Sequence, residues 1–93
     1  MNIITEEKIG GYFEVTGKAL LMCKEALDET RLAQANDFLD MASRYYSDAK
    51  HFHGKDDLVN AFACINYAHG WLDAGARIGL FKVRDSALFT VDD

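Results

Sequence analysis

Apolar residues recur every three or four positions along most of the chain, which is the spacing of one face of an α-helix. The clearest run predicts a helix over residues 29–53, where charged residues occupy the opposite face. A weaker stripe predicts a helix over residues 5–27, and a third stripe predicts a helix over residues 57–79. The sequence contains no Pro, so no residue forces a break within these three helices.

Polar residues mark where the predicted helices begin and end. Thr5 is the expected N-cap of the first helix, and either Asp28 or Thr30 is the expected N-cap of the second. Gly54 is expected to stop the second helix and Asp56 to cap the third. Because this turn is short, the second and third helices should be antiparallel neighbours. The pattern therefore predicts an all-α, antiparallel up-and-down three-helix bundle that forms a single domain.

The predicted third helix lacks a properly polar face. Its outer side carries Tyr67, Ala74 and Ile78, and a helix that is apolar nearly all round is normally covered nearly all round. The apolar C-terminal tail, residues 80–93, includes Phe89 and is too apolar for a free end. We expect this tail to fold back over the outer face, with packing on a second copy as the alternative. Together these four side chains form the candidate interaction surface.

Composition and charge narrow the class of function. A net charge of -5 opposes a surface that neutralises phosphates, so a nucleic-acid partner is not expected. The acidic N-terminus does not resemble a signal peptide, and no apolar run approaches the roughly 20 residues of a membrane span. We expect a soluble, cytoplasmic protein with no membrane partner. Cys23 and Cys64 are far apart in the sequence and are expected to be buried free thiols.

Few residues are spaced for chemistry. His69 and Asp73 lie four positions apart on the third helix, and with Asn66 they form a candidate polar site. A zinc site needs a third ligand that the spacing does not indicate, so we expect His69 to sit at the core edge, hydrogen-bonded to Asp73. Arg44 and His51 have the Arg-x6-His spacing of helical ribonuclease domains of the HEPN type, but the acidic charge opposes RNA binding. We expect no catalytic residue, metal or cofactor.

Two stretches carry a resemblance to a known family. INYAHGWLDAGARIGLF, residues 65–81, and FLDMASRYYSDA, residues 38–49, resemble the small archaeal family catalogued as domain of unknown function 357. The resemblance extends over most of the chain and is most specific in YAHGWLDAG. It implies an all-α, up-and-down three-helix bundle, which agrees with the apolar pattern. It implies no established activity and no functional residues.

Elimination leaves two classes of function. The first is a non-enzymatic protein–protein interaction or assembly module, acting as a homo-oligomer, for example a homodimer, or on a larger protein partner through the third helix and the tail. The alternative is a small-molecule-binding or RNA-binding helical domain with a site near His69 and Asp73. Ile78→Glu should dissociate an assembly, whereas His69→Ala should abolish ligand binding and leave the fold intact.

Overall fold

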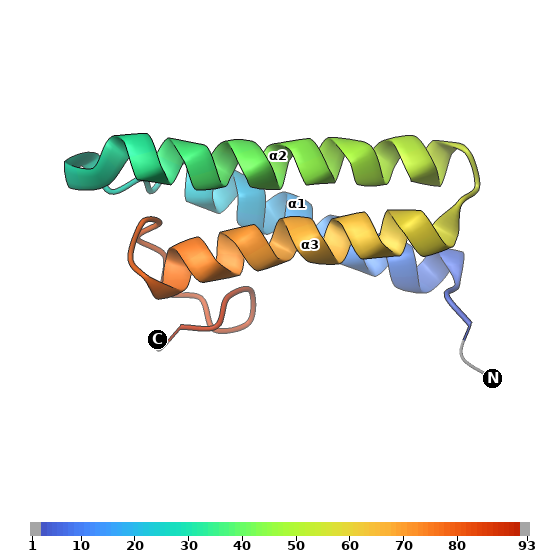
Figure 1. Ribbon diagram of the computed structural model, residues 1–93. Helices are drawn as coiled ribbons and strands as arrows, with labels where there is room; N and C mark the ends of the chain where they lie inside the picture. The colour runs from blue at the N-terminus through green and yellow to red at the C-terminus, as the bar shows by residue number, and fades with distance from the viewer. Residues whose placement is uncertain (1–2, 92–93) are drawn as a thin grey trace.

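The computed structural model describes residues 3–91, which form helices followed by a non-helical C-terminal segment. In chain order these are α1 (Glu6–Lys24), the short 3-10 helix η1 (Glu29–Arg31), α2 (Leu32–Gly54) and α3 (Leu58–Arg77). The three long helices run alternately up and down in an elongated bundle (Figure 1), and the described residues contain no strand. The predicted antiparallel three-helix bundle is therefore confirmed. None of the described helices is long and apolar enough to span a membrane.

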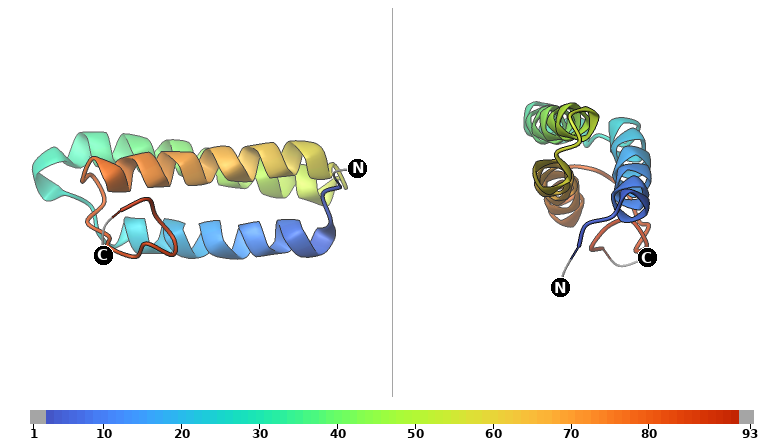
Figure 2. Two further views of the ribbon diagram at one scale, coloured as in Figure 1. Left: turned by 90° about the horizontal axis from the view of Figure 1, so that it is seen from below. Right: turned by 90° about the vertical axis from the view of Figure 1, so that its right-hand side faces the viewer.

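The helices are not packed equivalently. α2 and α3 form a hairpin with the most extensive contact, and α1 lies along one side of it, closer to α3 than to α2 (Figure 2). The bundle measures 44 × 25 × 18 Å, so its length is set by the helices themselves. This arrangement divides the surface of α3 into two flanks. We call them the α1-side flank, which carries His69 and Asp73, and the α2-side flank, which carries Tyr67, Ala74 and Ile78.

The core repeats every seven residues along each helix. Its buried positions include Ile9, Thr16 and Cys23 in α1, Ala35, Ala42 and Ala49 in α2, and Ala61, Ala68 and Gly75 in α3. A seven-residue repeat keeps one seam of each helix facing its neighbours. The buried positions of α2 and α3 are also equally distant in sequence from Lys55, so they lie at matching levels of the antiparallel hairpin. Small side chains at each level let the two helices approach closely.

The helix ends follow the predicted caps with small shifts. Thr5 caps α1 as predicted, because its hydroxyl oxygen accepts a hydrogen bond from the Lys8 N–H at 3.1 Å. Asp28, and not Thr30, is the second cap, and it precedes η1. The predicted second helix therefore begins as a 3-10 turn and becomes α-helical only at Leu32.

The α2–α3 turn differs from the prediction in its details. Gly54 is the last residue of α2, but the left-handed backbone conformation falls on Asp56, with a φ of 60°. The Asp57 N–H reaches back to the Phe52 carbonyl oxygen at 2.9 Å, which completes a Schellman motif. Because Asp56 is used to stop α2, it cannot cap α3. Asp57 does so instead, accepting a hydrogen bond from the Asn60 N–H at 3.1 Å, so the predicted cap at Asp56 is wrong.

Residues 80–91 fold back onto the bundle between α1 and α3 (Figure 2). The chain after α3 pairs with the α1–η1 connection, where the Lys82 N–H donates to the Ala26 carbonyl oxygen at 2.7 Å. A matching bond joins the Asp28 N–H to the Leu80 carbonyl oxygen at 2.8 Å. The tail thus covers the α1 side of α3, and not the outer face that the sequence predicted it to cover. The last two positions of the predicted tail, 92 and 93, lie outside the described residues.

Candidate functional site

His69 links three parts of the molecule. Its Nε2 lies 2.7 Å from the Leu88 carbonyl oxygen and its Nδ1 lies 3.1 Å from the Thr16 hydroxyl oxygen. A carbonyl oxygen only accepts hydrogen bonds, so Nε2 carries a proton, and in the neutral ring Nδ1 accepts from the Thr16 hydroxyl. The Phe89 ring stacks on the imidazole with a centroid distance of 6.4 Å. Both ring nitrogens therefore hold α3 against α1 and the tail.

Asp73 also binds the tail. Its carboxylate oxygens accept hydrogen bonds from the backbone N–H and the hydroxyl of Thr90. The predicted hydrogen bond between His69 and Asp73 is therefore wrong, because the tail supplies a separate partner to each side chain. Asn66, the third residue of the candidate polar site, is exposed and lines a groove on the opposite flank. The structure thus splits the predicted polar site into two tail anchors and one surface amide.

The polar groups around the tail anchors are satisfied within the protein. Among the described residues, every buried side-chain nitrogen or oxygen has a hydrogen-bond partner. In the same part of the chain, no three His, Cys, Asp or Glu side chains are grouped so that they could share a metal ion. The chemistry visible at His69 and Asp73 is therefore that of holding the C-terminal segment in place.

Arg44 and His51 lie on the solvent face of α2. The Arg44 Nε donates to Asp40 Oδ2 at 2.9 Å, across one helical turn. His51 is exposed, and its ring lies 5.6 Å from the ring of Phe52. The arginine of the Arg-x6-His pair is therefore engaged by a neighbouring carboxylate.

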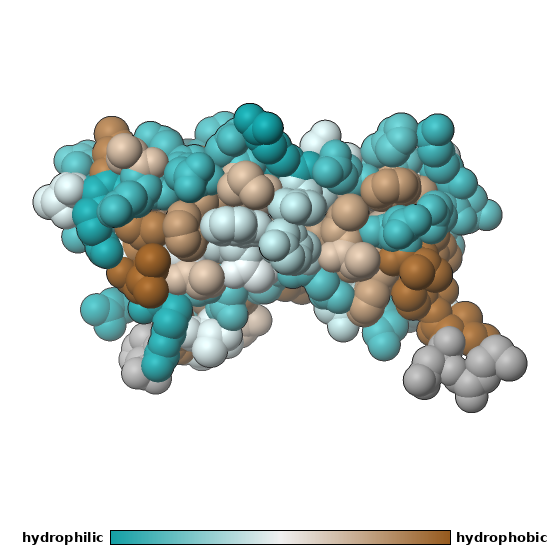
Figure 3. Space-filling model, viewed as in Figure 1, coloured by the Kyte–Doolittle hydropathy of each residue, from teal (hydrophilic) through white to brown (hydrophobic). Residues whose placement is uncertain are grey.

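The α2-side flank of α3 is apolar and open to solvent. Three of the four predicted surface residues are exposed there, and the exposed fraction is 54% for both Tyr67 and Ile78, while Ala74 is also exposed. Figure 3 shows pale and brown side chains across the middle of this face, over α3 and below the hydrophilic upper edge formed by α2. The fourth predicted residue, Phe89, is only 4% exposed. Its assignment to an exposed surface is wrong, because the tail turns its ring toward His69.

A shallow groove follows the boundary between α2 and α3 on this flank. It is lined by Phe38 of α2 and by Ala63, Asn66, Tyr67, Gly70, Trp71 and Ala74 of α3. Edge-to-face aromatic pairs form one wall, with ring centroids 5.0 Å apart for Phe38 and Trp71 and 4.4 Å apart for Tyr45 and Tyr67. The space above Gly70 is open, since a Cβ built there would meet no atom within 4 Å. Large and small residues therefore alternate along an exposed helix.

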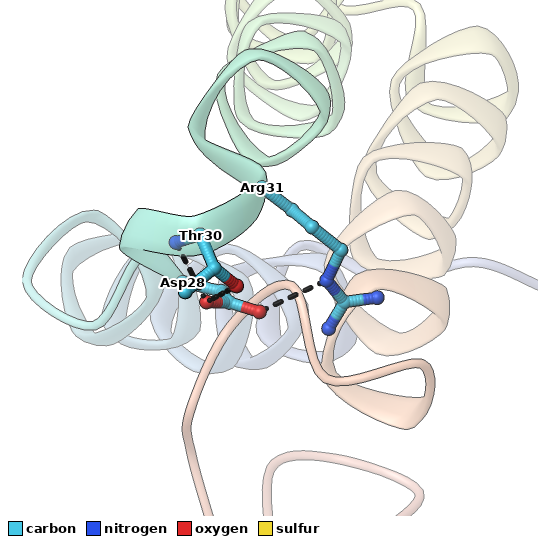
Figure 4. A network of polar contacts seen from close by, with 3 residues as sticks. All are labelled: Asp28, Thr30 and Arg31. Carbon is cyan, nitrogen blue, oxygen red and sulfur yellow. Dashed lines mark hydrogen bonds and ion pairs between the residues drawn. The ribbon is translucent and has the colours of Figure 1, made fainter.

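Asp28 fixes the connection between α1 and α2. Its Oδ1 accepts hydrogen bonds from the Thr30 hydroxyl at 2.7 Å and the Thr30 N–H at 3.0 Å, and its Oδ2 accepts from the Arg31 Nε at 2.9 Å (Figure 4). These bonds, with the Thr30 hydroxyl contributing most, lower the pKa of the Asp28 carboxyl from 3.8 to about 2. Because the Asp28 backbone also binds Leu80, this network holds the start of the tail.

The two cysteines are free, as predicted, but differ in burial. Cys23 is buried in the core, and burial raises the pKa of its thiol to about 12. Cys64 is only half-buried on the α2 side of α3, and the pKa of its thiol is raised first by partial burial and then by the negative charge of Asp48. Neither thiol is a thiolate nucleophile at neutral pH.

Comparison with known proteins identifies a family. No curated protein and no solved structure matches the chain. A family model described as "Protein of unknown function (DUF357)" matches residues 11–81, which include all of α2 and α3 and most of α1. The match covers well over half of the 93 residues and confirms the resemblance carried by residues 38–49 and 65–81. The chain therefore belongs to this family of proteins of unknown function.

Proposed function

We propose that the protein is a non-enzymatic assembly module that pairs with a second copy of itself through the outer face of α3. The supporting observation is an uncovered apolar strip, on which the exposed fraction reaches 70% for Val59 and 54% for both Tyr67 and Ile78. Contiguous exposed apolar surface on a small domain is typical of interaction sites. Fully burying side chains of this size contributes about 1.5–3 kcal/mol each, which is the driving force for pairing.

The spacing of this strip supports a second copy as the occupant. Its apolar residues and single glycine are Val59, Ala63, Tyr67, Gly70, Ala74 and Ile78, so the intervals between them read the same in both directions. In an antiparallel pair of identical helices related by a two-fold axis, Tyr67 of each copy would therefore lie level with Gly70 of the other. The largest side chain of the strip then meets the open space above its smallest residue. A two-fold interface requires this self-complementarity.

The charges at the ends of α3 also suit an antiparallel pair. Asp57 caps the first turn of α3 and Arg77 lies in its last turn. Antiparallel pairing would bring Arg77 of each copy toward Asp57 of the other, and the opposed helix dipoles would attract. The competing function, a ligand site at His69 and Asp73, has less support because the tail occupies both side chains.

The test is the molar mass in solution, measured by size-exclusion chromatography with light scattering over a range of concentrations. The wild-type chain should have the mass of a dimer that dissociates on dilution, and Ile78→Glu should be monomeric. Gly70→Leu is the sharper variant, because the isolated fold has space for the side chain but a partner helix does not. The matched control is Leu21→Glu, a residue of α1 that is 66% exposed away from the strip.

Two outcomes would overturn the proposal. One is a wild-type chain that remains monomeric at the highest attainable concentration. The other is a dimer whose mass survives both Ile78→Glu and Gly70→Leu while both variants keep the helical circular dichroism of the wild type. A dimer lost equally in Leu21→Glu would place the interface elsewhere and would also contradict the proposal.

A further inference from the structure

Basic side chains gather around one cleft at the end of α3 where the tail begins. Its volume is about 580 Å³, and it is lined by Arg31, Arg77, Lys82 and Arg84. Among the described residues, Asp28 is the one acidic side chain in the lining. The whole chain has a net charge of -5, so this concentration of positive charge is local and contrasts with the rest of the surface.

Two segments that are distant in sequence bring these cations together, namely η1 and the end of α3 with the tail that follows it. Arg31 belongs to η1 and reaches the end of α3, where a Cβ built on Gly79 would lie 3.1 Å from its Nη2 (Figure 4). Lys82 is held by the hydrogen bond from its backbone N–H to the Ala26 carbonyl oxygen. Arg84 follows two residues later on the same returning segment. The backbone pairing of the tail with the α1–η1 connection therefore builds the cleft.

The acidic side chain in the cleft offsets only part of this charge, because Asp28 pairs with Arg31 and attracts Lys82, and the lining keeps a net positive charge. Both oxygens of Asp28 already accept hydrogen bonds, and its ion pair is with Arg31. Within the described residues no ion pair is formed by Lys82 or Arg84. Arg77 has a structural explanation, because a cation in the last turn of a helix offsets the negative end of the helix dipole. That explanation does not extend to the two tail residues.

We propose that this cleft binds a small molecule that carries two or more phosphate groups. Guanidinium and ammonium groups donate strong charge-assisted hydrogen bonds to phosphate oxygens, and several cations around one cavity match a polyvalent anion. The volume is within the range of small-molecule sites. Phe81 and Val83 add an apolar wall for the remainder of such a ligand. An extended nucleic acid is disfavoured, since its backbone would run from the cleft onto an acidic surface.

This binding shares only Arg77 with the proposed self-association of α3, so its test uses tail residues that lie outside the paired strip. Isothermal titration calorimetry of the full chain with inorganic triphosphate, at about 0.1 M ionic strength and without divalent metal, measures the affinity directly. Lys82→Gln and Arg84→Gln should each weaken binding about tenfold, because each removes one charge-assisted contact. The double variant should weaken it about a hundredfold if the two contacts are independent. Both side chains are exposed, so the folded state should be retained.

The matched control is Lys18→Gln, which removes the same charge from an exposed position on α1. Its affinity for triphosphate should stay within about twofold of the wild type, since exposed charges beyond about 10 Å are largely screened. An equal loss in Lys18→Gln would show unspecific attraction and overturn the proposal. No binding of triphosphate at millimolar concentration would also overturn it. Binding of a single-stranded RNA that triphosphate does not displace would replace the small-molecule ligand with RNA.

Discussion

The two flanks of α3 are both rich in apolar residues, but only one of them is covered. On the α1 side, the tail buries Phe81 and Phe89 against the bundle and leaves them 1% and 4% exposed. On the α2 side, Tyr67 and Ile78 remain 54% exposed. Hydrophobicity alone does not distinguish the two flanks as a place for the tail. The sequence-based expectation, which rested on hydrophobicity, therefore placed the tail on the wrong flank.

Polar anchors and a missing side chain account for the difference. On the α1 side, His69 binds the Leu88 carbonyl oxygen and Asp73 binds Thr90, so backbone groups of the tail that would otherwise lose water gain partners. Gly75 also leaves room for the Phe81 ring. The α2-side groove offers aromatic walls and a small floor, and its polar groups are few, namely the Asn66 amide, the Tyr67 hydroxyl and the Trp71 indole N–H. An apolar segment is thus directed by the few polar groups that can satisfy its backbone.

The largest expected effect comes from filling the space that admits the tail. A Cβ at Gly75 would lie 2.3 Å from Cε2 of the buried Phe81 ring, so Gly75→Ala must displace that ring. We expect the free energy of unfolding to fall by about 3 kcal/mol, the upper part of the usual range for overpacking. Urea unfolding followed by circular dichroism measures it.

The control is the same substitution on the other flank of the same helix. Gly70→Ala meets no atom within 4 Å, so only the gain in helix propensity remains and stability should rise by about 1 kcal/mol. Equal destabilisation by the two substitutions would contradict the contrast between a covered and an open flank.

Removing an aromatic ring should also distinguish the flanks. Phe89→Ala should lower the free energy of unfolding by about 2 kcal/mol, less than a central core position, because the ring lies at the bundle edge where the tail can collapse. Limited proteolysis should then cut the tail faster than in the wild type. Tyr67→Ala should lower the free energy of unfolding of the monomer by only about 1 kcal/mol, mainly through the lost ring contact with Tyr45. A wild-type cleavage rate in Phe89→Ala would count against a tail held by this ring.

Acid should weaken the hydrogen-bond network of Asp28, which holds the start of the tail. The pKa of Asp28 is about 2 in the folded chain, below its ordinary value of 3.8, so the carboxylate stabilises the fold above pH 3.8. That contribution is lost as the pH falls from 3.8 toward 2 and is absent below both values. Between pH 5 and pH 2, the melting temperature should therefore fall less steeply in Asp28→Asn than in the wild type. Parallel pH profiles for the two proteins would show that Asp28 does not carry this dependence.

Thiol labelling compares the α2 side of α3, at Cys64, with the core of the bundle, at Cys23, without a substitution, and its expected effect is the smallest. Cys64 should react slowly with iodoacetamide at pH 8, because it is half-exposed but its pKa is raised by partial burial and by Asp48. Cys23 should react only when the protein unfolds, since it is buried and the pKa of its thiol is about 12. Mass spectrometry of the labelled peptides separates the two sites. Labelling of Cys23 ahead of Cys64 in the native state would reverse the assignment.

Local patterns in the sequence determined the helices and their order. Periodicity, the Thr5 cap and a short turn between α2 and α3 depend on residues near one another in the chain, and they predicted three antiparallel helices correctly. They also placed Tyr67, Ala74 and Ile78 together on the outer face of the third helix, but the prediction that the tail covers this face was wrong, and all three are exposed. The error in the N-cap of α3 is local and amounts to one residue, because Asp56 and Asp57 are both suitable caps. In the structure Asp56 takes the left-handed backbone conformation, so Asp57 is the cap.

Tertiary structure alone decided where the tail lies, which partners His69 and Asp73 take, and which cations share a cleft. Each of these depends on contacts between segments far apart in the sequence, such as the pairing of Leu27 with Phe81. Spacing within one helix placed His69 and Asp73 close together, but it could not reveal that a third segment supplies better partners. The basic residues from Arg31 to Arg84 show no pattern along the chain, because only the return of the tail brings them together. Periodicity reports the faces of a helix, whereas long-range packing and hydrogen bonding decide what covers each face.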